Sequence, residues 1–194
     1  MNSEHIFQQF RQLISNWLLL SDEQWKDFAS LFLLSKVKAK QVLLSPGQHR
    51  YQLYYIYSGI LRSFYVDNDR EYTKDFHCEN SFGGPIANAQ QRLSVDFGLE
   101  ALEDSILLTT DYHRFKSLCE DDPVFDKISL RIIENALIRK EKKLQSLGQK
   151  NATERYRDFQ KNYPLIQQRI AQYHIASYLG INQVTLSRLR KHIH

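Results

Sequence analysis

The chain has 194 residues, of which 42% are hydrophobic and 25% charged, a composition typical of an ordinary globular protein with one large domain or two smaller ones. No apolar run approaches the roughly 20 residues of a membrane-spanning helix, and no export signal opens the sequence. Two cysteines, Cys78 and Cys119, are too few for a disulfide scaffold or a four-thiolate metal site. These features predict a cytoplasmic protein with reduced thiols and no membrane partner.

The net charge of +4 is distributed unevenly along the chain. From Arg139 onward there are 12 Lys and Arg residues against three Asp and Glu residues, whereas acids outnumber bases before that point. A cationic segment of this kind is typical of proteins that bind a polyanion. We therefore expect a polyanion partner for the C-terminal part only.

The N-terminal part, residues 3–34, has a helical pattern. Apolar side chains recur every three or four positions from Ile6 to Trp17, which predicts an amphipathic helix. Ser21 is followed by acidic residues and is typical of an N-cap that opens a second, short helix. We expect these helices to cover one end of the domain that follows.

From Lys36 the helical period gives way to alternation, which is typical of β-strands. Ser58-Gly59 is expected to join two strands as a hairpin, and Asp67-Asn68-Asp69 to form the next turn. Short strands separated by turns every dozen or so residues predict an antiparallel sandwich or barrel over roughly residues 36–111. The predicted strands cover residues 36–43, 52–57, 60–66, 71–78, 96–100 and 105–110.

A short helix over residues 113–120 and a long helix over residues 123–147 come next. Asp121-Asp122-Pro123 favours the start of the long helix, and Gly148 marks its expected end. One interpretation is a helix packed on its own barrel. Its length of about 25 residues exceeds what a small barrel can cover, which favours self-association instead. The predicted apolar seam comprises Phe125, Ile128, Ile132, Ala136 and residues 144–147.

The last motif is QYHIASYLGINQVTLSRLRK, residues 172–191. Ala176 permits two helices to cross closely, and Gly180 tolerates the backbone conformation of a tight corner. These residues predict a helix-turn-helix whose second helix presents groove-reading side chains. The alternative is a plain αα-hairpin in a helical bundle. The outer face of the second helix carries Gln183, Val184, Ser187, Arg188 and Lys191.

This order of elements resembles the Crp–Fnr family of bacterial transcription regulators over nearly the whole chain. The residues that carry the resemblance are Ile175–Lys191, Ser45-Pro46-Gly47, Tyr57–Ile60 and Leu99–Asp104. It implies an α+β fold with N-terminal helices and an antiparallel, jelly-roll-like β-roll (1–122), a long dimerisation helix (123–148) and a helix-turn-helix domain (149–194). It also implies a homodimer through the 123–147 helix, a palindromic operator in double-stranded DNA, and RNA polymerase as a further partner.

The resemblance assigns the recognition helix to the run that starts at Gln183, with Asn182 as its N-cap. Gln183, Val184 and Arg188 would face bases, since they suit adenine, a thymine methyl group and guanine respectively. Because the sequence ends three residues after Lys191, we expect no β-wing after this helix. The residues expected near phosphates are Thr185, Ser187, Arg190, Lys191 and Arg169.

The β-roll sequence departs from the family's cyclic-nucleotide site. No glutamate follows Gly83, and Arg92 and Ser94 are not adjacent, so a cyclic phosphate would lack its paired groups. We therefore expect regulation that does not depend on cyclic AMP, through an unidentified effector if any. The alternatives are a β-roll that senses a nucleotide or another small molecule, and an interaction protein that does not bind DNA. The candidate effector pocket comprises Phe82, Gly83, Gly84, Arg92 and Ser94.

Enzymatic functions lack support in the sequence. His49, His77 and His113 form no His-x-His pair and have no closely spaced carboxylate, so they do not predict a metal site. No Gly-x-Ser-x-Gly motif or phosphate-binding loop occurs, nor does an N-terminal cysteine cluster for an iron–sulfur centre. We predict no catalytic site, no metal and no cofactor.

Overall fold

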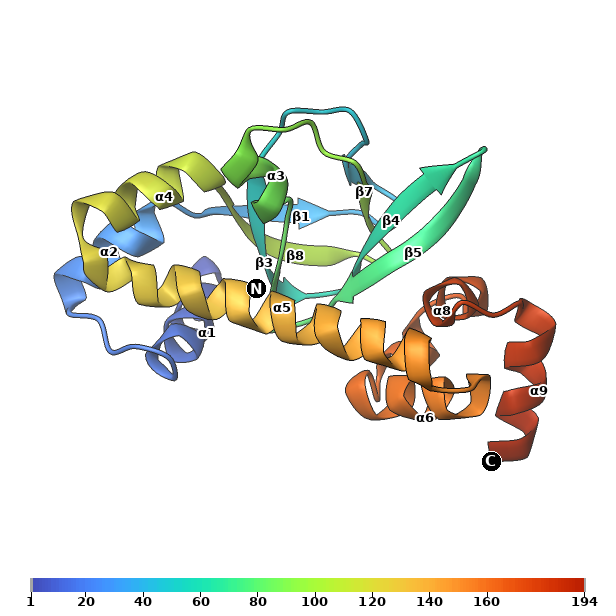
Figure 1. Cartoon of the computed structure of the whole chain (residues 1–194). Coiled ribbons are helices and arrows are strands. Elements are labelled where there is room, and N and C mark those ends of the chain that lie inside the picture. Colours follow the sequence, from blue (N-terminus) through green and yellow to red (C-terminus); the bar gives the residue numbers. More distant parts are fainter. Residues whose placement is uncertain (1, 194) are drawn as a thin grey trace.

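A computed structural model describes residues 2–193, with side chains described through residue 191. The long helix α5 connects the β-roll and N-terminal helices to the C-terminal helices (Figure 1). The helices are α1 (Ser3–Ser15), α2 (Asp22–Ser30), α3 (Ile86–Gln91), α4 (Tyr112–Asp121), the 3-10 turn η1 (Pro123–Phe125), α5 (Asp126–Gln149), α6 (Ala152–Asn162), α7 (Ile166–Arg169), α8 (Gln172–Leu179) and α9 (Gln183–Ile193). The strands are β1 (Leu33–Val37), β2 (Val42–Leu44), β3 (Gln52–Ser58), β4 (Leu61–Asp67), β5 (Arg70–His77), β6 (Ser81–Gly83), β7 (Gly98–Ala101) and β8 (Ser105–Asp111).

The strands form a roll of two four-stranded antiparallel sheets. One sheet has the order β1-β8-β3-β6 and the other the order β2-β7-β4-β5. Side chains from both sheets, including Ile56, Leu61 and Leu107, form a buried cluster that holds them together. The predicted α+β fold with an antiparallel roll is therefore confirmed, and the roll begins at Leu33 rather than Lys36.

The single strand predicted over residues 36–43 is wrong. Residues 38–41 turn the chain from the first sheet to the second, and Lys40 has a positive φ of 68°. The Lys40 amide donates to the Ala101 carbonyl at 2.7 Å, and the Ala101 amide donates to the Gln41 carbonyl at 3.0 Å. The alternating sequence pattern thus runs without interruption across a corner of the chain. The residues before the corner belong to β1 and those after it to β2.

The hairpin predicted at Ser58-Gly59 is also wrong. Strand β3 pairs with β6 and β8, whereas β4 pairs with β5 and β7, so these residues carry the chain from one sheet to the other. Gly59 has a φ of 106°, and a Cβ there would lie 2.1 Å from the Ser105 hydroxyl oxygen. The hairpin lies one turn later, where Asp67 pairs with Arg70 around the predicted turn.

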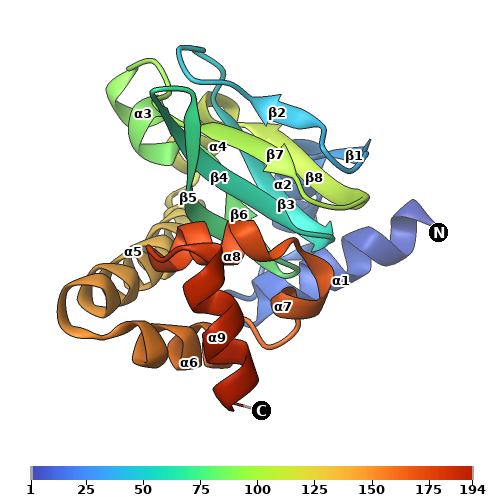
Figure 2. The same ribbon diagram turned by 90° about the vertical axis from the view of Figure 1, so that its right-hand side faces the viewer.

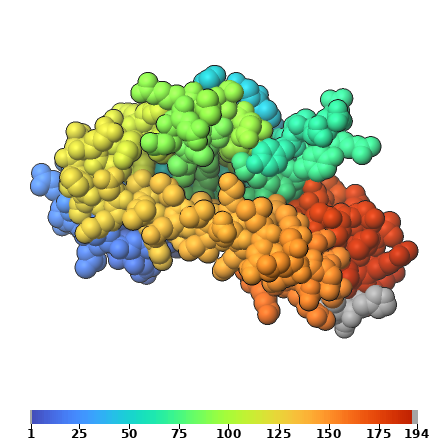
Figure 3. Space-filling model, viewed as in Figure 1, coloured from blue at the N-terminus to red at the C-terminus, as the bar shows by residue number. Residues whose placement is uncertain are grey.

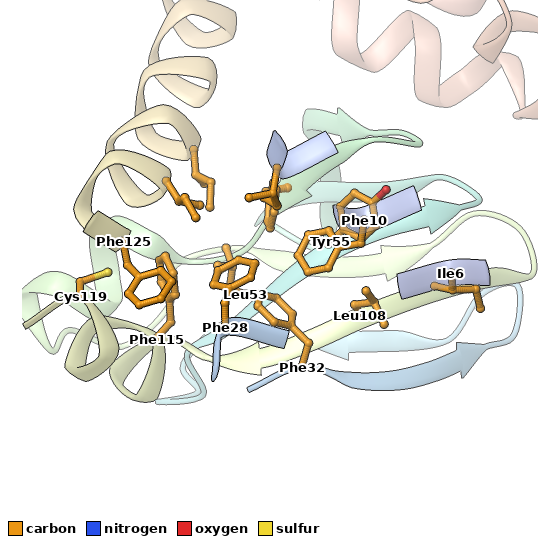
Figure 4. Close-up of a cluster of buried hydrophobic side chains, with 14 residues drawn as sticks. Ile6, Phe10, Phe28, Phe32, Leu53, Tyr55, Leu108, Phe115, Cys119 and Phe125 are labelled. Carbon is orange, nitrogen blue, oxygen red and sulfur yellow. The ribbon is translucent and has the colours of Figure 1, made fainter. Parts of the chain in front are cut away.

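The N-terminal helices pack on the roll through a cluster of mostly aromatic side chains (Figure 4). Phe10 of α1 stacks on Tyr55 of β3 with ring centroids 4.5 Å apart. Phe28 of α2 stacks on Phe125, at the start of the long helix, at 6.0 Å. Aromatic stacking of this kind adds to the stabilisation from burying apolar area. It also fixes the first turns of the long helix against the roll.

Helix α5 has two apolar faces. Ile128 and Ile132 are buried in the chain's own core, so the first part of the predicted seam does not face outward. The helix ends at Gln149, one residue after the glycine that marks its predicted end. A second set of apolar side chains is at least 41% exposed: Leu130, Ile133, Leu137, Ile138, Leu144 and Leu147.

The C-terminal helices form a third buried cluster that they share with the roll. Phe76 of β5 packs with Phe159 of α6 and Ile175 of α8 in this cluster. Figure 2 shows α8 beside the β4–β5 hairpin, and Figure 3 shows the red surface of the C-terminal helices adjoining the surface of that hairpin. Helices α6 and α8, within the segment predicted as a separate DNA-binding domain (149–194), therefore pack directly on the β-roll.

Candidate nucleic-acid interface

The corner between α8 and α9 has the geometry that the sequence predicts. Gly180 is left-handed, with φ 64° and ψ 38°, and the Ile181 amide donates to the Ala176 carbonyl at 3.0 Å. This six-residue hydrogen-bonded loop is the usual helix C-terminal motif that favours glycine. Helix α9 then begins after Asn182, whose side-chain oxygen accepts from the Thr185 amide at 2.8 Å. The N-cap role predicted for Asn182 is confirmed.

Helix α9 buries one side and exposes the other. Leu186 is fully buried against α6 and α8, while Gln183, Val184, Ser187 and Arg188 are exposed. Val184, Ser187 and Arg188 follow Gln183 by one, four and five residues, a spacing that places all four on a single face of the helix. The structure thus brings together the three side chains predicted to read bases, with Ser187 beside them and the exposed Lys191 one turn further on.

Two of the predicted phosphate-binding residues are less exposed. Thr185 is half-buried and contributes its amide to the Asn182 cap. Arg190 is also half-buried and lies near Tyr156 of α6. Burial raises the pKa of the Tyr156 phenol, and the positive charge of Arg190 partly opposes that shift. Arg190 therefore lies on the flank of α9 that faces α6.

Arg169 is not part of the α9 surface in this arrangement. Its guanidinium forms ion pairs with Glu79, at 2.5 Å, and with Glu103, both on the β-roll. The hydrogen bonds that Arg169 donates to Glu79 and then to Glu103 raise its pKa. Burial alone would raise the pKa of Glu79, but hydrogen bonds from Arg169 and the Gly59 amide hold it below its usual range. Arg169 therefore ties α7 to the roll.

Helix α8 contacts the roll through polar groups that the sequence pattern did not identify. Arg62 of β4 is 2% exposed, and its Nη1 donates to Nδ1 of His174 at 2.7 Å. The same guanidinium forms ion pairs with Glu71 and with Glu100, whose Oε1 lies 2.7 Å from Arg62 Nε. The Thr73 amide donates to the Ser177 hydroxyl oxygen at 2.8 Å. Arg62 and His174 are 112 positions apart in the sequence, so no local sequence pattern indicates that they pair.

His174 is neutral in this contact. Burial and, to a smaller extent, the neighbouring charge of Arg62 together lower its pKa to about 4. The neutral ring accepts from Arg62, whereas a protonated ring would place two cations at hydrogen-bond distance.

The five residues predicted as an effector pocket lie in different surroundings. Phe82 packs in the aromatic core against Trp17 and Tyr55. A Cβ at Gly83 would lie 3.0 Å from the His77 ring, and one at Gly84 would lie 2.5 Å from the Gln52 carbonyl oxygen. Arg92 and Ser94 are exposed in the loop after α3. The glycines permit close packing of the chain on itself, and none of the five lines either of the two cavities described below.

The described residues contain no group of three or more His, Cys, Asp or Glu side chains placed to hold a metal ion. Cys78 and Cys119 are free thiols. Burial raises the pKa of Cys78 to about 12 and that of Cys119 to about 11, which keeps both protonated near neutral pH. None of the helices within residues 2–193 has the length and apolar character required to cross a membrane.

No protein-family model and no curated protein sequence matches the chain. Its similarity is to solved structures. FixK2 from Bradyrhizobium japonicum aligns with a TM-score of 0.71 at 17% identity, over 84% of this chain and 84% of that one. The c-di-GMP responsive global regulator CLP from Xanthomonas campestris aligns with a TM-score of 0.69 at 17% identity, over 87% and 89% of the two chains.

A protein from Eubacterium rectale, described provisionally as a transcriptional regulator of the crp/fnr family, aligns with a TM-score of 0.65 at 16% identity, over 89% of this chain and 83% of that one. At such identities the likeness concerns the fold. The chain has the fold of the Crp–Fnr regulators, with a β-roll, a long helix and a C-terminal helix-turn-helix.

Proposed function

We propose that this chain is a sequence-specific DNA-binding transcription regulator. The observation that supports it most strongly is the exposed face of α9, where Gln183, Val184 and Arg188 have no intramolecular hydrogen-bond partner among the described residues. A recognition helix reads bases with residues near its N-terminus, where two of these side chains lie. Arg188 pairs with guanine through two hydrogen bonds, and Ser187 and Lys191 contact phosphates beside it.

The proposed regulator acts as a homodimer through the exposed apolar stripe of α5. The stripe residues are Leu130, Ile133, Leu137, Leu144 and Leu147, and Lys140 occupies the one remaining position of the repeat. Their spacing alternates between three and four residues, which is the pattern of a two-stranded coiled coil. An exposed apolar stripe of this length is unfavourable in a monomer, because it leaves apolar area in water.

Sedimentation tests the dimer directly. The chain is expected to sediment as a dimer at micromolar concentration, and Leu137→Glu as a monomer with the same circular dichroism spectrum. Arg131→Ala, an exposed change on the same helix outside the stripe, should remain dimeric. A monomeric parent chain would contradict the proposal.

The proposed regulator does not depend on cyclic AMP. The support is the dispersal of the predicted pocket residues, since Arg92 and Ser94 are exposed while Gly83 packs against His77. A cyclic phosphate taken out of water needs a cation and hydrogen-bond donors arranged together. Calorimetry with cyclic AMP is expected to give no binding heat, and saturable binding at micromolar concentration would contradict this part of the proposal.

Selection of random DNA duplexes by the purified chain tests the function itself. A homodimer with one recognition helix per subunit should enrich two half-sites related by two-fold symmetry. Their centres should lie about 10 base pairs, or a multiple of that distance, apart. Failure to enrich any sequence would overturn sequence-specific binding. Enrichment of single, unpaired sites would leave DNA binding intact and overturn the dimeric mode.

A further inference from the structure

A cavity of about 390 Å³ lies where the C-terminal half of α5, helix α6 and the end of α8 meet. Its apolar walls include Phe159, Tyr178 and Leu179. The volume lies within the range typical of small-molecule sites, about 300–1,000 Å³. A second, smaller cavity of about 210 Å³ lies between β5 and the α6–α7 connection, and its two cations are paired with carboxylates.

The larger cavity is lined by more cations than carboxylates. Asp158 is the one acidic residue that lines it in the described part of the chain, and it pairs with Lys150 at 2.5 Å. Arg139 pairs with Asp75, outside the cavity, at 3.5 Å. The cations that line the cavity are Arg139, Lys142, Lys143, Lys150 and Arg155. Three of them, Lys142, Lys143 and Arg155, have no carboxylate partner among the residues that the structure describes.

Arg155 leaves a buried donor unused. Its Nη1 donates to the Lys150 carbonyl at 2.8 Å, but its Nε is buried and makes no hydrogen bond to any described residue. Buried polar groups nearly always have a partner, and a charged donor without one is costly. A guanidinium presents its Nε and Nη groups as a fork that matches two oxygens of a phosphate or carboxylate.

Lys143 is a second cation held in apolar surroundings. Its Nζ donates to the carbonyls of Thr73, at 3.1 Å, and Lys74, at 2.6 Å, and lies 4.0 Å from the centre of the Tyr178 ring. Burial lowers its pKa to about 8, against an opposing effect of Asp75. The amine is therefore mostly charged at neutral pH, and a nearby anion would stabilise that charge.

We propose that this cavity binds a phosphate-bearing small molecule, held by Arg155 and Lys143 with Lys142 at the edge. The cavity has the volume of a small-molecule site, which a rigid DNA duplex on the molecular surface cannot enter. The ligand would contact α5, which carries the proposed dimer stripe, and α6 and α8, which support the proposed recognition helix. Ligand binding itself does not depend on whether the chain binds DNA.

Calorimetric titration with inorganic pyrophosphate at pH 7 and constant ionic strength tests the site without DNA. One saturable site per chain is expected. Arg155→Met should weaken binding about tenfold or more, because charged hydrogen bonds contribute strongly. Lys142→Gln changes an exposed residue and cannot unfold the chain, and it should weaken binding about threefold. Arg157→Ala, an exposed arginine on the same helix outside the cavity, should bind as the parent chain does.

Absence of saturable binding would overturn the proposal, as would an equal loss in Arg157→Ala and Arg155→Met. A parallel titration with duplex DNA separates the two sources of phosphate. If Arg155→Met weakens duplex binding but pyrophosphate does not bind, the cavity cations serve DNA and the small-molecule site is rejected. Pyrophosphate binding in a chain that binds no DNA would support the site and contradict only the proposed function.

Discussion

The two helices of the helix-turn-helix differ in what their polar side chains contact. On α8, His174 accepts from the buried Arg62 and Ser177 accepts from the Thr73 amide, so both are satisfied inside the molecule. On α9, Gln183 and Arg188 are exposed and have no partner among the described residues. Groups that are paired internally contribute to stability, whereas those without a partner are available to an external ligand.

This difference separates two kinds of effect. Changes on the α8 side should lower the free energy of unfolding, because they leave buried charged groups unpaired. Changes on the exposed face of α9 should leave folding unaffected and alter binding. The four predictions that follow test this separation, from the largest expected effect to the smallest.

Arg62→Ala is expected to have the largest effect on stability. It removes the buried cation between Glu71 and Glu100 and leaves His174 without its donor. Breaking a buried charged pair in this way costs about 3–5 kcal/mol of unfolding free energy. Urea denaturation measures it. Glu71→Gln alters the half-exposed partner and should cost about 1 kcal/mol or less, so similar losses in the two variants would contradict the assignment.

Arg188→Ala is expected to weaken binding to a selected duplex by about 1–3 kcal/mol and to relax base preference at one position. The unfolding midpoint should not change, because the side chain has no internal partner among the described residues. Fluorescence anisotropy with matched and mismatched duplexes measures both effects. Lys127→Ala, an exposed cation at the far end of α5, is the control. Equal weakening on all duplexes would show that Arg188 contacts phosphate only.

Asn182→Ala is expected to cost about 1 kcal/mol, because it removes the acceptor for the Thr185 amide at the start of α9. For a chain of this size the Tm should fall by about 2–4 °C per kcal/mol. Asn182→Ser retains a capping oxygen and should keep most of the stability. If both variants behave alike, the cap does not position α9.

The smallest predicted effect is a pH dependence through His174. Its pKa is about 4 in the folded chain against an ordinary value of 6.5, so the folded state binds fewer protons than the unfolded state between these values. The contribution of His174 to stability is therefore present above about pH 6.5 and is lost as the pH falls toward 4. At pH 5.5 the loss should be about 1 kcal/mol or less.

His174→Gln cannot titrate and should reduce the fall in Tm between pH 7 and pH 5.5. Comparing the two proteins removes the contribution of all other acidic and basic groups. A parallel fall in both proteins would show that His174 is not the titrating group.

The sequence predicted those elements that depend on local signals. The amphipathic period of the helices, the alternation of the strands and the Gly180–Asn182 corner all act within a few residues, so the roll, α5 and the helix-turn-helix could be located. The Ser58-Gly59 turn could not be interpreted correctly, because a hairpin and a crossing between two sheets require the same flexible residues. The choice depends on the close approach of Ser105, which lies far away in sequence.

Contacts between residues far apart in the sequence explain the other differences between the predicted and the observed structure. Arginine commonly contacts phosphate, which is why Arg169 was predicted to do so, but its guanidinium forms ion pairs with Glu79 and Glu103 of the roll. Helix α5 carries two apolar seams in one segment, and only packing shows that Ile128 and Ile132 face the chain's own core while Leu137 does not. The cations that line the larger cavity come mostly from α5 and α6. The sequence pattern predicted both helices, but it did not show that they pack together around a cavity.

The most direct test of DNA recognition by α9 is a salt titration of binding to a selected duplex and to a scrambled duplex of the same length. We predict that affinity for both duplexes falls steeply and linearly with salt on logarithmic axes, because phosphate contacts release counterions. The selected duplex should keep an advantage of at least about a thousandfold at physiological salt. Failure to bind either duplex at low salt, or equal affinity for both, would contradict sequence-specific recognition by this chain.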